Sequence, residues 1–162
     1  MASYLLSWLK GKYAGLSRTD FEKQWPGSWI VWEAGPWRPP SLAGTTIIPR
    51  DPDGSLPGGG ESLAIELQVH AGRSGVTVGR APENDVVVKD ATLSRTHLAF
   101  DRGPGGAWRV RDAGSSNGTL LEGSALGTAP VELRSGAALQ AGNVRFTYYD
   151  PAGLHFRLRG MG

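Results

Sequence analysis

The sequence predicts a mainly β protein: an antiparallel β-sandwich preceded by a short, partly helical appendage rich in tryptophan. The first observation is an alternation of apolar and polar residues: Ile65, Leu67 and Val69 alternate with polar residues at the period of a half-buried strand. The second observation is that similar short runs recur from residue 63 onward, with turn residues between them. The third observation is composition, since 24 glycines and 11 prolines are typical of a chain with many turns. Many short strands with regular turns favour a sandwich.

Each expected strand is a short run rich in β-branched, aromatic or other apolar residues. The Gly-Pro-Gly-Gly segment at 103–106 lies between two such runs and predicts the tip of a hairpin. The runs lie at 65–69, 76–78, 86–88, 98–100, 108–110, 119–121, 131–133, 138–139, 144–149 and 154–158.

The composition divides the chain into three parts. Residues 1–34 form the tryptophan-rich appendage, since residues 1–37 hold five of the six tryptophans. Residues 35–62 are expected to be a linker, because closely spaced prolines and glycines prevent a continuous helix or strand. Residues 63–158 then form the sandwich domain.

Two short helices and a strand are expected in the appendage. Ser3 is in position to cap a first helix, which has one apolar face and ends near Gly15. Thr19 and Glu22 match the capping box of a second helix. The aromatic and β-branched residues at 28–33 predict a buried strand.

Three uses of this aromatic segment remain open. So many aromatic side chains rarely stay in water, which favours folding of the segment onto the sandwich. A surface for a protein partner or for self-association is the second use. Contact with a membrane surface is the third, although Lys10, Lys12 and Lys23 form only a modest basic face.

Charge and composition argue against several classes of protein. The chain has 17 basic and 15 acidic residues, and this balance does not indicate binding to nucleic acid. The absence of cysteine excludes disulfides and thiolate chemistry, and it is compatible with the cytoplasmic location that we expect. No apolar run reaches the roughly 20 residues of a membrane span.

We expect no catalysis, no metal and no cofactor. Ser94, His97 and Asp112 have the side chains of a hydrolase triad, but no Gly-x-Ser-x-Gly turn is present. Ser94 and His97 are also only three residues apart at a loop-to-strand boundary, where their side chains need not face each other. His70 and His155 are far from His97 in the sequence, and no cysteine accompanies them as a metal ligand.

Three short polar patches hold most of the groups suited to binding a ligand. They are Gly79-Arg80, Ser-Arg-Thr-His at 94–97 and Ser-Ser-Asn-Gly at 115–118, each at a boundary between strand and loop. Their guanidinium, hydroxyls and amide suit a phosphate, which carries about −1.5 to −2 charge and three acceptor oxygens. Loops at one end of a sandwich cluster in space, so we expect the three patches to face one anion.

The order and spacing of these motifs resemble the forkhead-associated (FHA) domain, a module that recognises phosphothreonine. The resemblance covers residues 63–150, a little over half of the chain, and does not extend to residues 1–60. Each motif alone has low specificity, whereas the ordered set is highly specific. The set comprises Gly79-Arg80, a turn at Asn84-Asp85, Ser94-Arg95-x-His97, a strand with Trp108, the run from Asp112 to Thr119, Gly136 and Gly142.

The resemblance implies that five residues bind the phosphothreonine peptide directly. Arg80 and Ser94 would bond the phosphate oxygens, with the backbone amide of Arg95 beside them. Ser116 would add a hydroxyl or an amide. Asn117 would hold the peptide backbone just after the phosphothreonine.

The resemblance implies a structural role for Gly79, His97, Asp112 and Gly118, which shape and join the loops. Gly118 in particular suits a turn that needs a positive φ. It also implies a preference for threonine over serine, because the extra methyl group fills a small pocket. The implied partners are phosphothreonine-containing proteins and a serine/threonine kinase.

Two positions depart from the family pattern. Ala137 follows Gly136 where the family often has an aspartate, which predicts a local loss of stability. Thr92 stands two residues before Ser94, where some members carry a basic residue that selects an acidic side chain at the third position after phosphothreonine. We therefore expect an aliphatic or undefined preference at that peptide position.

Thr45 and Thr46 are candidate phosphoacceptors in the predicted linker. Some bacterial relatives carry an amino-terminal threonine pair that a kinase phosphorylates and their own FHA domain then binds. Tethering gives an effective concentration on the order of millimolar, so even a weak site would close on itself. The alternative is an ordinary linker without this role.

The predicted function is therefore a non-enzymatic phosphothreonine-binding adaptor in serine/threonine kinase signalling, and a further hypothesis is its regulation through its own threonines. The alternative from another class is a scaffold that docks a partner without phosphate through the sandwich and the tryptophan-rich segment. A component of a secretion apparatus is a further alternative, which rests on family precedent alone.

Overall fold

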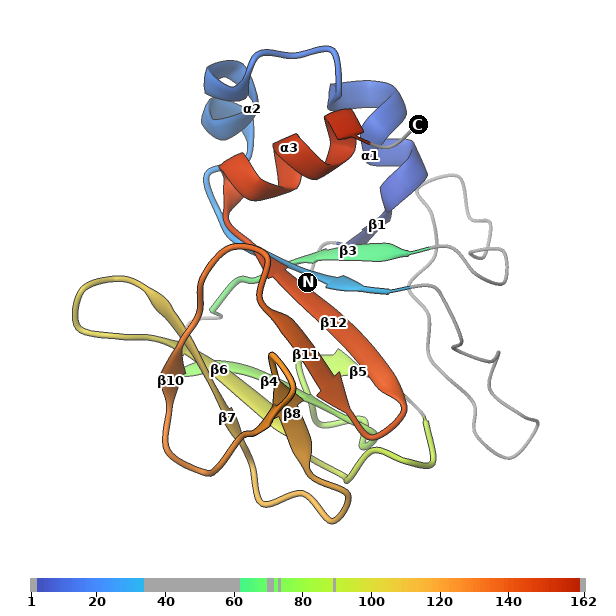
Figure 1. The fold of residues 1–162 in the computed structure, drawn as a ribbon, viewed down its shortest axis with the longest axis vertical. Coiled ribbons are helices and arrows are strands. Elements are labelled where there is room, and N and C mark those ends of the chain that lie inside the picture. Colours follow the sequence, from blue (N-terminus) through green and yellow to red (C-terminus); the bar gives the residue numbers. More distant parts are fainter. Residues whose placement is uncertain (1–2, 34–61, 70–71, 73, 89, 161–162) are drawn as a thin grey trace.

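Two β-sheets pack face to face, and a layer of helices covers part of the larger sheet (Figure 1). The computed structural model of the chain describes residues 3–33, 62–69, 72, 74–88 and 90–160. Neighbouring strands pair in antiparallel fashion except β4 and β5, which are parallel. The predicted β-sandwich is confirmed.

The described strands form one larger and one smaller sheet. The larger sheet has the order β1 (Ser3–Leu5), β3 (Leu63–Glu66), β2 (Trp29–Trp32), β12 (Val144–Tyr149), β11 (Ala138–Ala141), β8 (Thr119–Leu121) and β9 (Ser124–Ala125). The smaller sheet has the order β10 (Val131–Glu132), β7 (Trp108–Asp112), β6 (Leu98–Arg102), β4 (Gly75–Gly79) and β5 (Val86–Val87).

The strand expected at 28–33 is β2, and it lies inside the larger sheet. It pairs with β3 on one side and with β12 on the other. All four of its residues are buried, because the two faces of the strand meet different layers. Ile30 and Trp32 enter the core between the sheets, whereas Trp29 and Val31 face the helices. Residues near the start of the chain therefore complete the sheet, while the three-part division of the chain stays a prediction.

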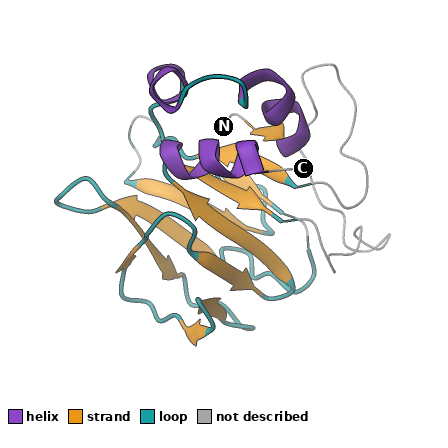
Figure 2. Ribbon diagram, turned by 45° about the horizontal axis from the view of Figure 1, so that its top comes forward, coloured by secondary structure: helices purple, strands orange, loops and turns teal. Residues whose placement is uncertain are grey.

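Three helices form a layer on the outer face of the larger sheet (Figure 2). They are α1 (Leu6–Tyr13), α2 (Arg18–Gln24) and α3 (Pro151–Gly160). Leu9, Phe21, Leu154 and Leu158 are fully buried and pack with Trp29 of the sheet. The expected folding of the aromatic segment onto the sandwich is thereby confirmed. None of the described helices is long and apolar enough to cross a membrane.

The predicted starts of the first two helices were wrong. Ser3 belongs to β1, where it pairs with Ile65, and α1 begins after Leu5 without a side-chain cap. The cap of α2 is Ser17 rather than Thr19, since the Ser17 hydroxyl accepts a hydrogen bond from the Asp20 amide at 3.1 Å. Pairing of β1 with β3 removes Ser3 from any capping position.

The strand predicted at 154–158 is also wrong, because these residues lie in α3. Asp150 caps this helix: its Oδ1 accepts a hydrogen bond from the Gly153 amide at 2.7 Å. Pro151 occupies the first helical position, where its missing N–H costs nothing. Leu154 and Leu158 therefore share one buried face at helical spacing.

Glu33, directly after β2, joins the sheet to the helical layer. Its carboxylate forms a two-pronged ion pair with Arg157 of α3, with 2.7 Å between Nη2 and Oε1. The hydroxyls of Thr147 and Ser62 also donate to it. Burial alone would raise the pKa of Glu33, but the hydrogen bonds and charge of Arg157 and the two hydroxyls lower it. This cluster ties α3 to β2 and β12.

Candidate functional site

Arg80 follows the end of β4 and connects its own loop to the loop before β6. Its backbone N–H donates to the carbonyl oxygen of Ser94 at 3.0 Å, and its Nε donates to the carbonyl oxygen of Leu93 at 3.1 Å. The residue is exposed, and neither Nη atom has a hydrogen-bond partner among the described residues. The guanidinium is thus held beside Ser94 with donors still available.

Gly79 allows this close approach of two loops. A Cβ atom at this position would overlap the backbone carbonyl of Arg95 and crowd the Cα of Thr96. Any other residue would therefore separate β4 from the loop that carries Ser94. The observed geometry gives Gly79 the spacing role that the sequence suggests.

Ser94 and Ser116 meet, although they are 22 residues apart in the sequence. The Ser116 amide donates to the Ser94 hydroxyl oxygen at 2.9 Å. Ser94 is half-buried, whereas Ser116 is exposed. The loop before β6 and the loop between β7 and β8 therefore share one surface.

His97 joins the same two loops from beneath. Its ring is fully buried, and Nδ1 accepts a hydrogen bond from the Ser94 amide at 3.1 Å. Nε2 lies 2.9 Å from the carbonyl oxygen of Gly118, so it carries the proton of a neutral imidazole. Both ring nitrogens are used within the protein.

Asp112 shapes the loop that carries Ser116 and Asn117. Its carboxylate accepts hydrogen bonds from the amides of Gly114 and Ser115 and from the hydroxyls of Ser115 and Thr119. Burial opposes ionisation, but these hydrogen bonds outweigh it and lower the pKa of Asp112.

The turn that follows Asp112 has the conformation that the sequence suggests. Gly118 adopts a φ of 78°, in the left-handed region expected for this turn. Its amide donates to the Ser115 hydroxyl at 3.0 Å. The carboxylate of Asp112 and the glycine together fix the course of the loop.

Asn117 connects the loop between β7 and β8 to the segment before Ser94. Its Nδ2 donates to the carbonyl oxygen of Thr92 at 2.7 Å. The Thr92 hydroxyl donates to Asp90 and accepts from the amide of Asn143 at 2.9 Å. The turn between β11 and β12 thus supports the same loop, a contribution that the sequence did not reveal.

Arg95 and Asn84 also belong to the loops that follow β4 and precede β6. The Arg95 guanidinium is exposed and forms an ion pair with Glu83 at 3.2 Å. Asn84 is buried, and its amide donates to the carbonyl oxygens of Ala81 and Arg95. The sequence identified Asn84 only as part of a turn, whereas the structure shows that it joins the Arg80 loop to the Ser94 loop.

The predicted residues therefore come together at one end of the sandwich. Arg80, Ser94, Ser116 and Asn117 lie on loops that are joined by direct hydrogen bonds. This end is opposite the helices, because β12 begins beside the Thr92 loop and ends where α3 starts. Thr45 and Thr46 lie outside the described residues.

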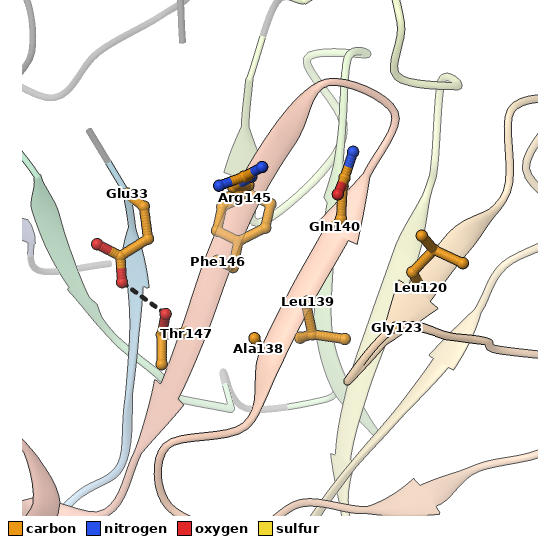
Figure 3. Close-up of a pocket in the computed structure, with 9 residues that line it drawn as sticks. All are labelled: Glu33, Leu120, Gly123, Ala138, Leu139, Gln140, Arg145, Phe146 and Thr147. Atoms are coloured by element: carbon orange, nitrogen blue, oxygen red, sulfur yellow. Dashed lines mark hydrogen bonds between the residues drawn. The ribbon is translucent and has the colours of Figure 1, made fainter. Parts of the chain in front are cut away.

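A surface hollow lies elsewhere in the fold. It has a volume of about 400 Å³ and lies on the larger sheet, beside Glu33 and between β8, β11 and β12 (Figure 3). Arg145, Gln140 and Leu120 are among its lining residues. No predicted ligand-binding residue lines this hollow, so it is separate from the candidate site.

Replacing Asp112 with asparagine is expected to lower the free energy of unfolding by about 2 kcal/mol at pH 7. The NH2 group that replaces Oδ2 cannot accept from the hydroxyls of Ser115 and Thr119, and hydrogen bonds to a charged group contribute roughly 1.5–3 kcal/mol. Denaturant unfolding measures the change, with Asp101→Asn as control, because its ion pair with Arg109 is about one-third exposed and should contribute much less to stability.

The cost of Asp112→Asn should also depend on pH. The folded pKa of Asp112 is lowered, so its stabilisation is complete above the ordinary value of 3.8 and is lost as pH falls through the folded value. The difference in the free energy of unfolding between the variant and the natural protein should therefore become smaller in acid. A difference in the free energy of unfolding that stays constant from pH 7 to pH 2 would contradict stabilisation by the ionised Asp112 carboxylate.

Comparison with known proteins agrees with this arrangement. The family model of the FHA domain matches residues 76–142. The oxoglutarate dehydrogenase inhibitor of Corynebacterium diphtheriae is 31% identical over 112 residues, which cover 69% of this chain and 68% of that protein. The glycogen accumulation regulator GarA of Mycolicibacterium smegmatis is 32% identical over 115 residues, which cover 67% of this chain and 70% of that protein.

A solved structure is similar as well. The FHA domain of an Arabidopsis thaliana protein, determined in solution, superposes with a TM-score of 0.52 and 26% identity. The match covers 76% of this chain and 86% of that domain. On these grounds the chain belongs to the FHA-domain family.

Proposed function

We propose that this protein is a phosphothreonine-binding adaptor in serine/threonine kinase signalling. Its ligand is held at the end of the sandwich by Arg80, Ser94, Ser116, Asn117 and the backbone amide of Arg95. The observation that carries the proposal is the direct hydrogen bond between the Ser116 amide and the Ser94 hydroxyl, beside a guanidinium bonded to the same loop.

The arrangement suits a phosphate because it joins one permanent positive charge to several neutral donors. The exposed Nη atoms of Arg80 provide a fork that matches two phosphate oxygens. The Ser94 and Ser116 groups now bonded to each other can turn towards the third oxygen. Asn117 is exposed at the rim, where an extended peptide that leaves the phosphate would pass.

Catalysis by a serine–histidine pair has no support in this geometry. His97 Nδ1 accepts from the backbone amide of Ser94 rather than from its hydroxyl. Its Nε2 faces the carbonyl of Gly118, so no lone pair remains to take a proton from Ser94. Asp112 is engaged by its own loop. We therefore propose a non-enzymatic role, like that suggested by the names of the inhibitor and regulator among its relatives.

The partners would be phosphothreonine-containing proteins and the kinase that modifies them. Regulation by phosphorylation of Thr45 or Thr46 stays a prediction. If it occurs, the phosphorylated chain should lose affinity for an outside phosphopeptide, because its own threonine would occupy the site. Equal affinity before and after phosphorylation would exclude this regulation while leaving the binding function intact.

Binding to a library of phosphothreonine peptides and to the same library without phosphate tests the proposed function. We expect retention of phosphorylated sequences only, since the site offers a cationic fork for the phosphate. Equal retention of both libraries would favour the phosphate-independent scaffold instead. The preferred residue at the third position after phosphothreonine should be uncharged, because the Thr92 hydroxyl is already bonded to Asp90 and Asn143.

A further inference from the structure

The hollow on the larger sheet begins close to the loops of the phosphothreonine site, although it shares no residue with them. Its volume is about 400 Å³, and its lining residues come mainly from β8, β11 and β12. Leu120 of β8 follows Asn117 by three residues, and Arg145 of β12 follows Asn143 by two. A strand advances about 3.3 Å per residue, so both side chains start within about 10 Å of those asparagines. The hollow therefore continues the surface of the loops.

A chain of hydrogen bonds leads from the phosphate-binding loops to the hollow. Asn117 Nδ2 donates to the carbonyl oxygen of Thr92 at 2.7 Å, and the Thr92 hydroxyl accepts from the amide of Asn143 at 2.9 Å. Asn143 lies in the turn between β11 and β12, which both line the hollow. A peptide that passes Asn117 in the direction away from Ser94 therefore meets this turn and then the hollow.

Three side chains cross the sheet at the end of the hollow nearest this turn (Figure 3). Gln140 is the cross-strand partner of Leu120 on one side and of Arg145 on the other. Leu120 is 41% exposed, which is unusual for a leucine in a sheet with a buried inner face. The small side chain of Ala138 lies farther from the turn and leaves room behind the row. The row thus offers one apolar, one amide and one cationic group to a chain that lies across it.

The end of the hollow near the loops is positively charged. Arg145 is exposed, and within the described part of the chain its guanidinium forms neither a hydrogen bond nor an ion pair. The Glu33 carboxylate is already held by Arg157. Glu122, beyond the row, accepts a hydrogen bond from the amide of Ala138 at 3.0 Å. The charge of Arg145 is therefore available to an acidic group from outside.

We propose that the hollow binds the segment of a phosphothreonine peptide that follows the phosphothreonine, through an acidic side chain on Arg145 and an apolar side chain on Leu120. This inference rests on the proposed function, because the phosphate holds the peptide at the loops. Asn117 would hold the backbone just after the phosphothreonine. An extended peptide advances about 3.3 Å per residue, so about the fourth to sixth residues after the phosphothreonine reach the hollow.

Titration calorimetry of the full chain with four peptides tests this proposal. The short peptide is a library-selected phosphothreonine sequence that ends at the third residue after the phosphothreonine. The second peptide adds Glu-Leu-Glu-Leu at its carboxyl end, the third adds Gly-Ser-Gly-Ser there, and the fourth adds Glu-Leu-Glu-Leu at its amino end. We expect the second to bind at least about fivefold more tightly than the third, from one exposed ion pair and one apolar contact. The fourth should bind within a factor of two of the short peptide.

The outcomes separate this inference from the proposed function. Equal affinities of the second and third peptides would overturn the inference, while binding of the short peptide would leave the phosphothreonine site intact. An equal gain from the amino-terminal extension would overturn the assigned direction and the place of the segment in the hollow. Failure of all four peptides to bind would overturn both the proposed function and the inference that rests on it.

Two variants assign the gain to the lining residues. Arg145→Gln removes an exposed charge, so the affinity for the second peptide should fall at least about threefold and that for the short peptide should stay unchanged. Leu120→Ser removes the apolar contact and should have the same selective effect. Arg134→Gln removes an equal charge from an exposed position near the other end of β12 and should change neither affinity. Equal losses for the short and second peptides in Arg145→Gln would overturn the assignment.

Discussion

Replacing Arg80 with alanine should weaken the binding of a phosphothreonine peptide at least about tenfold. A hydrogen bond to a charged group contributes roughly 1.5–3 kcal/mol, and about 1.4 kcal/mol corresponds to one decade in affinity. Hydrogen bonds to the carbonyl oxygens of Leu93 and Ser94 hold Arg80, and with it a positive charge, beside Ser94. Titration calorimetry with a peptide selected from the library measures the loss.

The matched control is Arg159→Ala, which removes an exposed arginine from α3 at the other end of the sandwich. It changes the net charge equally and should alter affinity by less than a factor of two. Arg80→Lys keeps the charge but loses the two-pronged guanidinium, so its affinity for the phosphopeptide should lie between those of the natural protein and of Arg80→Ala. A loss of less than a factor of two for Arg80→Ala would contradict the assigned role.

Arg157→Met should produce the largest loss of stability, about 3 kcal/mol at pH 7. Methionine preserves much of the side-chain volume but leaves the Glu33 carboxylate, with 18% of its side chain exposed, without its ion pair. Breaking a buried pair by removing one partner typically costs about 3–5 kcal/mol, and partial exposure places this pair at the lower end. Chemical denaturation of the full chain measures the change.

The pH dependence of this variant follows from the lowered pKa of Glu33. Stabilisation by the ionised carboxylate is complete above its ordinary value of 4.5 and is lost as pH falls through the folded value. The free energies of unfolding of the variant and of the natural protein should therefore become more similar in acid. Arg159→Met on the same helix should change stability by less than about 0.5 kcal/mol. Equal losses for both variants would show that α3 does not depend on the Glu33 pair.

Most of the sandwich was predictable from the sequence because its strands alternate and its turns are marked by glycine and proline. The meeting of the loops that carry Arg80, Ser94 and Asn117 was predictable because their motifs occur in a fixed order. The sequence could not show the contact of Asn143 with Thr92, which joins residues 51 apart. Such contacts depend on how the loops meet after the sheets have packed.

The errors have local and non-local causes. In α3, Leu154, Phe156 and Leu158 resemble an alternating strand, but the Asp150-Pro151 pair is a helix start that outweighs the alternation. Phe156 accordingly points to solvent and is 80% exposed. Ser3 could not be placed from its neighbours, because its partner in β1–β3 pairing is Ile65.

The place of β2 also changes how the amino-terminal residues should be tested. This strand lies between β3 and β12 and buries Trp29 and Ile30 on opposite faces. Removal of the segment would expose both faces of the larger sheet, so a truncated chain is a poor control for the role of these residues.

Amide chemical shifts of the full chain, recorded with a library-selected phosphothreonine peptide and with its unphosphorylated counterpart, test the central claim most directly. The phosphopeptide should shift the signals of Arg80, Arg95, Ser116 and Asn117 in a saturable way, and the unphosphorylated form should leave them unchanged. Equal shifts with both peptides, or shifts confined to the helical layer, would contradict a phosphate site built from these loops.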